Sequence, residues 1–185
     1  MSTDLLELAI DSTRSVLANV VPEQFRDPTP CTKWNVSQLI NHVIGDQFYF
    51  SGVLVGEDRI RDPSDFSKGN FLSIFDTGAS LCVEAFGSEG VMGETFSLFS
   101  SETSGSSLVR IAATDTFVHG WDLARATGQG SNLSPDLALK LLVAEKIAIS
   151  PIVRSASGSP FGPERAAGID ASEADRLAAY FGRHL

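Results

Sequence analysis

The sequence predicts an all-α fold, a bundle of four or five helices joined by long loops. Apolar residues recur at helical spacing in several separate segments, whereas the alternation that is typical of strands occurs in one short stretch. Helix-start and helix-stop signals border these segments, and the connections are long enough for crossovers between antiparallel helices. The expected helices cover residues 5–20, 36–55, 71–86, 106–126 and 134–149, with a short last helix over 172–182.

The length and composition are typical of an ordinary globular protein. A chain of 185 residues suits one domain, so we expect a single helical domain over residues 1–185. Apolar runs are too short for a membrane span, and the acidic N-terminus is unlike a secretory signal. A net charge of −9 repels phosphate backbones and argues against nucleic acid as a partner. Cys31 and Cys82 make no disulfide framework, which favours a reducing cytoplasm.

The first expected helix has clear borders. Thr3 or Asp4 can cap its start, and Val21-Pro22 ends its apolar pattern. Three prolines within residues 22–34 then predict a fixed loop rather than a regular element.

The second expected helix has the strongest start signal in the chain. Asn35 followed by Gln38 is a variant of the capping box, in which each side chain bonds the backbone of the other residue. Trp34 precedes this cap and can pack on Leu39, at the fourth helical position. His42 lies beside the apolar stripe of this helix, where a histidine taken alone is more often hydrogen-bonded than a metal ligand.

The segments on either side of the fourth helix have mixed signals. Gly78 weakens the helix expected over residues 71–86. The Gly- and Ser-rich segment that follows contains an alternating stretch, Glu94 to Phe99, which indicates extended structure. Ser134 and Pro135 predict a helix start by a serine cap and a proline at the first position. Residues 155–170 contain glycines and prolines and should form a loop on the bundle.

The fourth expected helix carries polar residues on the face that should point to the core. At about 100° per residue, its apolar stripe is interrupted by Asp115, His119 and Asp122. Buried charges are usually paired or bound to a metal, because a lone buried carboxylate is costly. Asp115 and His119, four residues apart, point into the same space and could share a divalent cation. A structural hydrogen bond between them is the alternative that these residues leave open.

A second helix must supply the remaining ligands of such a site. The chain has three histidines, and His184 lies one residue from the end, where fraying disfavours a well-defined site. His42 and His119 therefore remain as the pair for one internal site. Helix bundles commonly build metal sites from inward side chains on facing helices.

Two segments of the sequence resemble a known family. They run from Pro28 to Gly45, with the pattern P-C-x-x-W-x-V-x-x-L-x-x-H, and from Asp115 to Gly128, with the pattern H-x-W-D-L-A-R-A-T-G. Residues 161–163 and 176–183 are also similar. The chain resembles the actinobacterial metal-binding proteins related to the N-terminal domain of mycothiol-dependent maleylpyruvate isomerase, within the DinB/YfiT-like superfamily.

The resemblance implies a DinB-like four-helix bundle, here with an additional short helix and long loops. It also implies one divalent ion with three protein ligands, which are His42, Asp115 and His119 by motif position. The isomerase has glutamate at the place of Asp115, and this chain lacks room for its separate C-terminal domain. These departures bear on the specific isomerase reaction more than on the metal site.

Two imidazoles and one carboxylate with an open fourth position are typical of catalytic zinc. Zinc is the expected ion, and nickel or another divalent ion is the alternative. Family members are proposed to bind mycothiol through the metal, so that the metal-bound thiolate attacks a small electrophile. We therefore expect a thiol-dependent transferase or isomerase. The alternatives are a non-catalytic module that senses metal or thiol and binds a protein partner, a metal-hydroxide hydrolase, and a scaffold with a vestigial site. A homodimer is left open.

Other residues near these three have expected roles of their own. Asp122 could accept a hydrogen bond from the ring N–H of His119 and orient the ring, or it could pair with Arg125. Trp121 points from another face and should pack in the core. Cys31 lies in the proline loop, where we expect it to pack rather than to act as a nucleophile.

Overall fold

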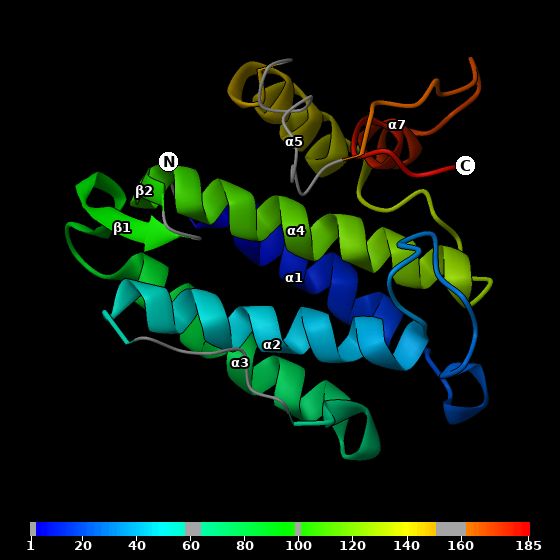
Figure 1. Cartoon of the computed structure of the whole chain (residues 1–185), viewed down its shortest axis with the longest axis horizontal. Coiled ribbons are helices and arrows are strands. Elements are labelled where there is room, and N and C mark those ends of the chain that lie inside the picture. Colours follow the sequence, from blue (N-terminus) through cyan, green and yellow to red (C-terminus); the bar gives the residue numbers. More distant parts are fainter. Residues whose placement is uncertain (1–2, 58–63, 99–100, 151–161) are drawn as a thin grey trace.

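A computed structural model describes residues 3–57, 64–98, 101–150 and 162–185. Figure 1 shows a bundle of long helices with a shorter pair on one side. The long helices are α1 (Asp4–Leu17), α2 (Val36–Leu54), α3 (Phe71–Gly87) and α4 (Gly105–Ala126). The shorter pair is α5 (Pro135–Ala148) and α7 (Glu173–Tyr180), and single turns of 3-10 helix cover Pro22–Gln24, Phe66–Lys68 and Val91–Gly93.

The four long helices pack in two pairs. Helix α1 lies along α4, and α2 lies along α3, while α2 and α4 are also in contact. Helices α5 and α7 pack on each other and on α4 (Figure 1). The prediction of an all-α, DinB-like bundle is confirmed. The extended stretch expected after the third helix is present as a hairpin of β1 (Thr95–Leu98) and β2 (Ser101–Ser104), while Phe99 lies outside the described residues.

The helix starts follow the predicted caps in part. The Asn35 side chain accepts from the backbone N–H of Gln38, and the Gln38 side chain accepts from that of Asn35, as the capping box requires. Helix α4 begins slightly earlier than predicted, because Ser104 is its N-cap. Thr3 and Ser134 occupy cap positions without a side-chain cap bond, so the capping predicted for them is wrong. Ser134 has a φ of 32°, which turns its side chain out of the usual cap geometry.

Close contact between helices explains why two helical positions are occupied by glycine. A Cβ at Gly78 of α3 would lie 3.1 Å from the Cβ of Gln47, so the residue that weakens α3 locally lets α2 approach. A Cβ at Gly120 would lie 3.2 Å from the Cα of Thr13 on α1. The Thr13 hydroxyl donates to the carbonyl of Thr116 at 2.8 Å and joins the same two helices. Helices α1 and α4 therefore approach each other closely at Gly120, the residue after His119.

Some expected borders and core positions differ from the structure. Helix α1 ends at Leu17 rather than near Val20, although Val20 is still buried. Leu81, an apolar residue of the helix expected over residues 71–86, is 43% exposed, because it lies on the outer side of α3. Residues 155–161 of the expected loop lie outside the described residues, and 162–170 contain no helix or strand. No helix in the described ranges has the length and apolar character needed to cross a membrane.

Candidate metal centre

The candidate metal centre lies where α2 and α4 meet. Helix α2 supplies His42, and α4 supplies Asp115, His119 and Asp122 from one face. The 3.6-residue repeat of α4 places Asp115 directly one turn before His119. The strong cap of α2 at Asn35 fixes the start of that helix, and His42 follows two turns later.

The three predicted ligands converge. His119 Nε2 lies 3.5 Å from Asp115 Oδ1, and His42 Nε2 lies 3.8 Å from Asp115 Oδ2. One ligand atom from each of the three residues lies within 4.8 Å of the others. The imidazole rings are 4.7 Å apart between centroids and nearly perpendicular. Both histidine side chains are more than nine-tenths buried, whereas Asp115 is 30% exposed. An ion held by these atoms would therefore be reached from the side of Asp115.

His119 is oriented by a second carboxylate on its own helix. Its Nδ1 lies 3.0 Å from Asp122 Oδ2, and an ionised carboxylate can only accept, so Nδ1 carries the hydrogen. Nε2 is then free to face Asp115 and an ion. This is the arrangement in which an outer carboxylate fixes the tautomer of a metal-binding histidine.

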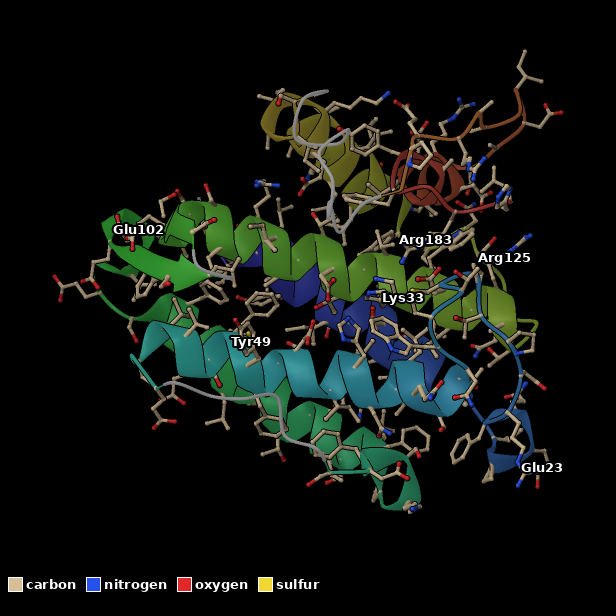
Figure 2. All side chains as sticks on the ribbon, in the orientation of Figure 1. Glu23, Lys33, Tyr49, Glu102, Arg125 and Arg183 are labelled. Carbon is tan, nitrogen blue, oxygen red and sulfur yellow. The ribbon has the colours of Figure 1, made fainter. Side chains whose placement is uncertain are left out.

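Asp122 takes its other hydrogen bonds from the C-terminal segment. Arg183 donates from Nη2 to Asp122 Oδ2 at 2.8 Å and from Nε to Oδ1 at 3.1 Å. Figure 2 shows Arg183 close to α4, whereas Arg125 lies further along the bundle. The expected alternative pairing of Asp122 with Arg125 is wrong, because Arg125 is exposed and its guanidinium lies 5.6 Å from the Trp121 ring centroid.

The electrostatics of the centre favour a positive charge. Burial lowers the pKa of His119, but Asp115 and Asp122 outweigh this effect and raise the pKa to about 10. Burial raises the pKa of Asp115, but the charges of His119 and His42 and hydrogen bonds outweigh it, so the pKa falls below its ordinary value. In the protein without metal, the proton on His119 occupies the place where a cation would be favoured.

The sequence matches a known family over the residues that form this centre. The family is described as the mycothiol maleylpyruvate isomerase N-terminal domain, and the match covers residues 6–124, more than half of the chain. The chain belongs to this family. The matched region contains His42, Asp115, His119 and Asp122, whereas Arg183 lies beyond it.

Two mycobacterial proteins are similar to this member of the mycothiol maleylpyruvate isomerase N-terminal domain family. They are uncharacterized protein MT0763 and uncharacterized protein Rv0738, from the CDC 1551 / Oshkosh and ATCC 25618 / H37Rv strains of Mycobacterium tuberculosis. Each is 34% identical over 178 residues, which are 95% of this chain and 93% of the relative. The similarity therefore includes the C-terminal segment. No solved structure matches the chain significantly.

Trp34 covers the two histidines. Its ring centroid lies 4.1 Å from that of His42, with an interplanar angle of 30°, and 5.6 Å from that of His119. The Thr29 hydroxyl, 2.8 Å from the carbonyl oxygen of Trp34, holds the loop that carries this ring. The sequence predicted only packing of Trp34 on Leu39. Its contact with His42, two turns into α2, depends on the return path of the proline loop.

Asp46 is a site residue that the sequence interpretation missed. It lies one turn after His42 on α2, and its Oδ2 is 3.4 Å from His42 Nε2. The residue is 2% exposed, and a hydrogen bond joins its carboxyl group to that of Asp115. The sequence pattern that could have indicated Asp46 is a carboxylate four residues after a candidate ligand. Such pairs are also common on solvated helix faces.

The structure also locates three other residues discussed from the sequence, of which one lies at the edge of the centre and two lie outside it. Cys31 contributes a thiol within 4.8 Å of one ligand atom each of His119 and Asp122, so the proline loop brings it to the edge of the centre. Trp121 is fully buried, as predicted, and its Nε1 donates to Asp175 at 2.9 Å. His184 is exposed and is no part of this centre.

Proposed function

We propose that this chain binds a divalent metal ion and uses a low-molecular-weight thiol, mycothiol, in a transferase or isomerase reaction on a small electrophile. The observation that carries the proposal is the convergence of His42, Asp115 and His119 at the α2–α4 contact. Membership of a family described by a mycothiol-dependent isomerase supports the choice of thiol.

The residues present fit a divalent ion. Two neutral imidazoles and a carboxylate are ligands that zinc accepts, and imidazole also suits nickel, iron and copper. His119 presents Nε2 because Asp122 holds its Nδ1, so the ring needs no rearrangement to bind an ion. An ion held there would favour the thiolate form of an incoming thiol, because cations lower the pKa of groups that bind them.

The neighbouring side chains determine from which side reactants would approach the ion and hold its ligands in position. Asp115 is the partly exposed ligand, so thiol and electrophile would approach from its side. Trp34 lies against His42 and His119 and keeps water from those two rings. Arg183 holds Asp122 in place, and Asp122 holds the tautomer of His119. We also infer that residues 1–185 act as one domain, because a C-terminal arginine completes a hydrogen-bond chain that begins on α4.

Calorimetry of the metal-loaded protein with mycothiol tests this proposal. Free thiols near pKa 8.5 are mostly protonated at neutral pH, so binding as thiolate releases a proton. The measured heat should depend on the ionisation enthalpy of the buffer, with about one proton released per thiol bound. Metal-free protein and the His42→Ala variant should show neither the heat nor the proton release.

Two other outcomes would replace the proposed reaction. Loaded protein that ignores thiols but hydrolyses a model ester, with a pH profile centred near 7, would be a metal-hydroxide hydrolase. Loaded protein that binds mycothiol but transfers it to no electrophile in a panel of small activated alkenes and epoxides would be a thiol-sensing module.

A further inference from the structure

Asp46 brings a second carboxylate to the metal centre from the helix that carries His42. Its contacts are with two of the three predicted ligands, at 3.4 Å to His42 Nε2 and through a hydrogen bond to Asp115. The side chain is almost fully buried, with 3% of its surface exposed. A buried carboxylate is costly unless its charge is compensated, so Asp46 needs positive charge in this part of the core.

Three separations among these four side chains are close to those between ligands of one small cation. Donors about 2.1 Å from an ion lie about 3.4 Å apart at the corners of a tetrahedron and about 3.0 Å apart as neighbours in an octahedron. The observed separations are 3.4 Å for His42–Asp46, 3.8 Å for His42–Asp115 and 3.5 Å for His119–Asp115. The carboxyl groups of Asp46 and Asp115 are also in hydrogen-bonding contact, so one cation could bind an oxygen of each.

We propose that Asp46 binds the metal ion together with His42, Asp115 and His119. This inference rests on the proposed metal-binding function and extends it to the coordination number and class of the ion. Four side chains already fill the positions of a tetrahedral zinc ion. An ion that accepts five or six ligands, and that takes carboxylate and imidazole together, keeps room for a thiol, which favours manganese, iron, cobalt or nickel.

The test compares the wild type with Asp46→Asn, a substitution of nearly the same size. Affinities for Mn²⁺ and Zn²⁺ are measured by competition with a chelator, and absorption spectra are recorded with Co²⁺. Asp46→Asn should weaken Mn²⁺ binding at least about tenfold and Zn²⁺ binding less, because the lost donor is a hard oxygen. The Co²⁺ spectrum should also change. Asp76→Asn, which removes an exposed carboxylate on α3, is the matched control and should change neither.

A second readout does not depend on the stability of a variant. In a crystal structure of the metal-loaded wild type, an Asp46 oxygen should lie about 2.0–2.2 Å from the ion. Asp46 more than about 3 Å away, or an Asp46→Asn protein with unchanged affinities and Co²⁺ spectrum, would overturn its role as a ligand. If Asp115→Asn loses the ion in that case, the metal-binding function stands. A wild type that takes up no ion overturns both proposals.

Discussion

At the scale of single residues, His119 is held on both nitrogens by carboxylates of its own helix. Asp122 accepts from Nδ1, and Asp115 faces Nε2. These two acids raise the pKa of His119 to about 10 in the metal-free protein. The imidazole is therefore protonated at neutral pH, and an ion that binds Nε2 must displace this proton.

Metal affinity should rise with pH for this reason. Below a pKa of about 10, one His119 proton leaves for each ion bound, so the apparent affinity should increase about tenfold per pH unit. Chelator competition at pH 6, 7 and 8 measures the slope. An affinity that does not vary with pH would show that His119 is already neutral.

The raised pKa of His119 also determines how the stability of the metal-free protein changes with pH. A folded-state pKa raised above the ordinary 6.5 stabilises the protein fully below pH 6.5. This stabilisation is lost as the pH rises through about 10. The metal-loaded protein should lack this loss, because its His119 is already neutral and keeps only the Nδ1 hydrogen that Asp122 accepts.

Replacing His119 with alanine should abolish metal binding and destabilise the bundle. The variant leaves Asp115 and Asp122 without their imidazole partner, at a cost on the order of 2–4 kcal/mol. Urea unfolding measures the loss, with His184→Ala as the control because that histidine is exposed. Equal unfolding curves for His119→Ala and the wild type would mean that the Asp–His contacts contribute nothing to the fold.

The sequence predicts some of these residues and not others, for physical reasons. Asp115, His119 and Asp122 were detectable because polar residues interrupt an apolar stripe within one helix. Arg183 was not, because it meets Asp122 from 61 positions away through a C-terminal segment without a repeating pattern. Asp46 lies beside the stripe of α2, where local periodicity alone does not separate a buried from a solvated carboxylate.

At the scale of elements, the contact between α1 and α4 depends on Gly120. A Cβ there would meet the side chain and the Cα of Thr13, so α1 would have to move away from α4 beside His119. Gly120→Ala should therefore cost about 1–3 kcal/mol, although alanine favours a helix. Thermal unfolding tests this expectation. Gly87→Ala at the end of α3 is the control and should be nearly neutral, because an added Cβ would have no neighbour within 4 Å among the described residues beyond its own helix backbone.

The segment after α7 contacts the candidate metal centre through Arg183. Removing its guanidinium leaves the fully buried Asp122 with His119 as its remaining hydrogen-bond partner among the described residues. Arg183→Ala should cost about 3–5 kcal/mol and weaken metal binding about 10–100-fold. Arg125→Ala should change stability by less than about 0.5 kcal/mol, because Arg125 is exposed. Similar behaviour of the two variants would show that Arg183 does not support the site.

Helix borders were predictable wherever a local signal decided them. The capping box at Asn35 and the proline at the start of α5 act within one turn, so pattern and structure agree. Of the two strands of the hairpin, only β1 was predictable from the sequence. Strand β1 alternates polar and apolar residues, but β2 is Ser-Glu-Thr-Ser and pairs through its backbone with β1.

At the scale of the whole molecule, the bundle gathers charged groups from distant parts of the chain into one buried cluster. His42 and Asp46 come from α2, Asp115, His119 and Asp122 from α4, and Arg183 from the C-terminal segment. Each is costly in an apolar core by itself, and their charges can be compensated by one another or by a bound cation. The central claim is that these groups are retained to hold such an ion.

Elemental analysis of protein loaded with a divalent ion and then freed of excess by gel filtration tests this claim most directly. The wild type and His184→Ala should retain one ion per chain, and His42→Ala and His119→Ala should retain none. A wild type without bound metal, or equal retention by the His42→Ala and His119→Ala variants, would contradict the assignment of the α2–α4 contact as a metal centre.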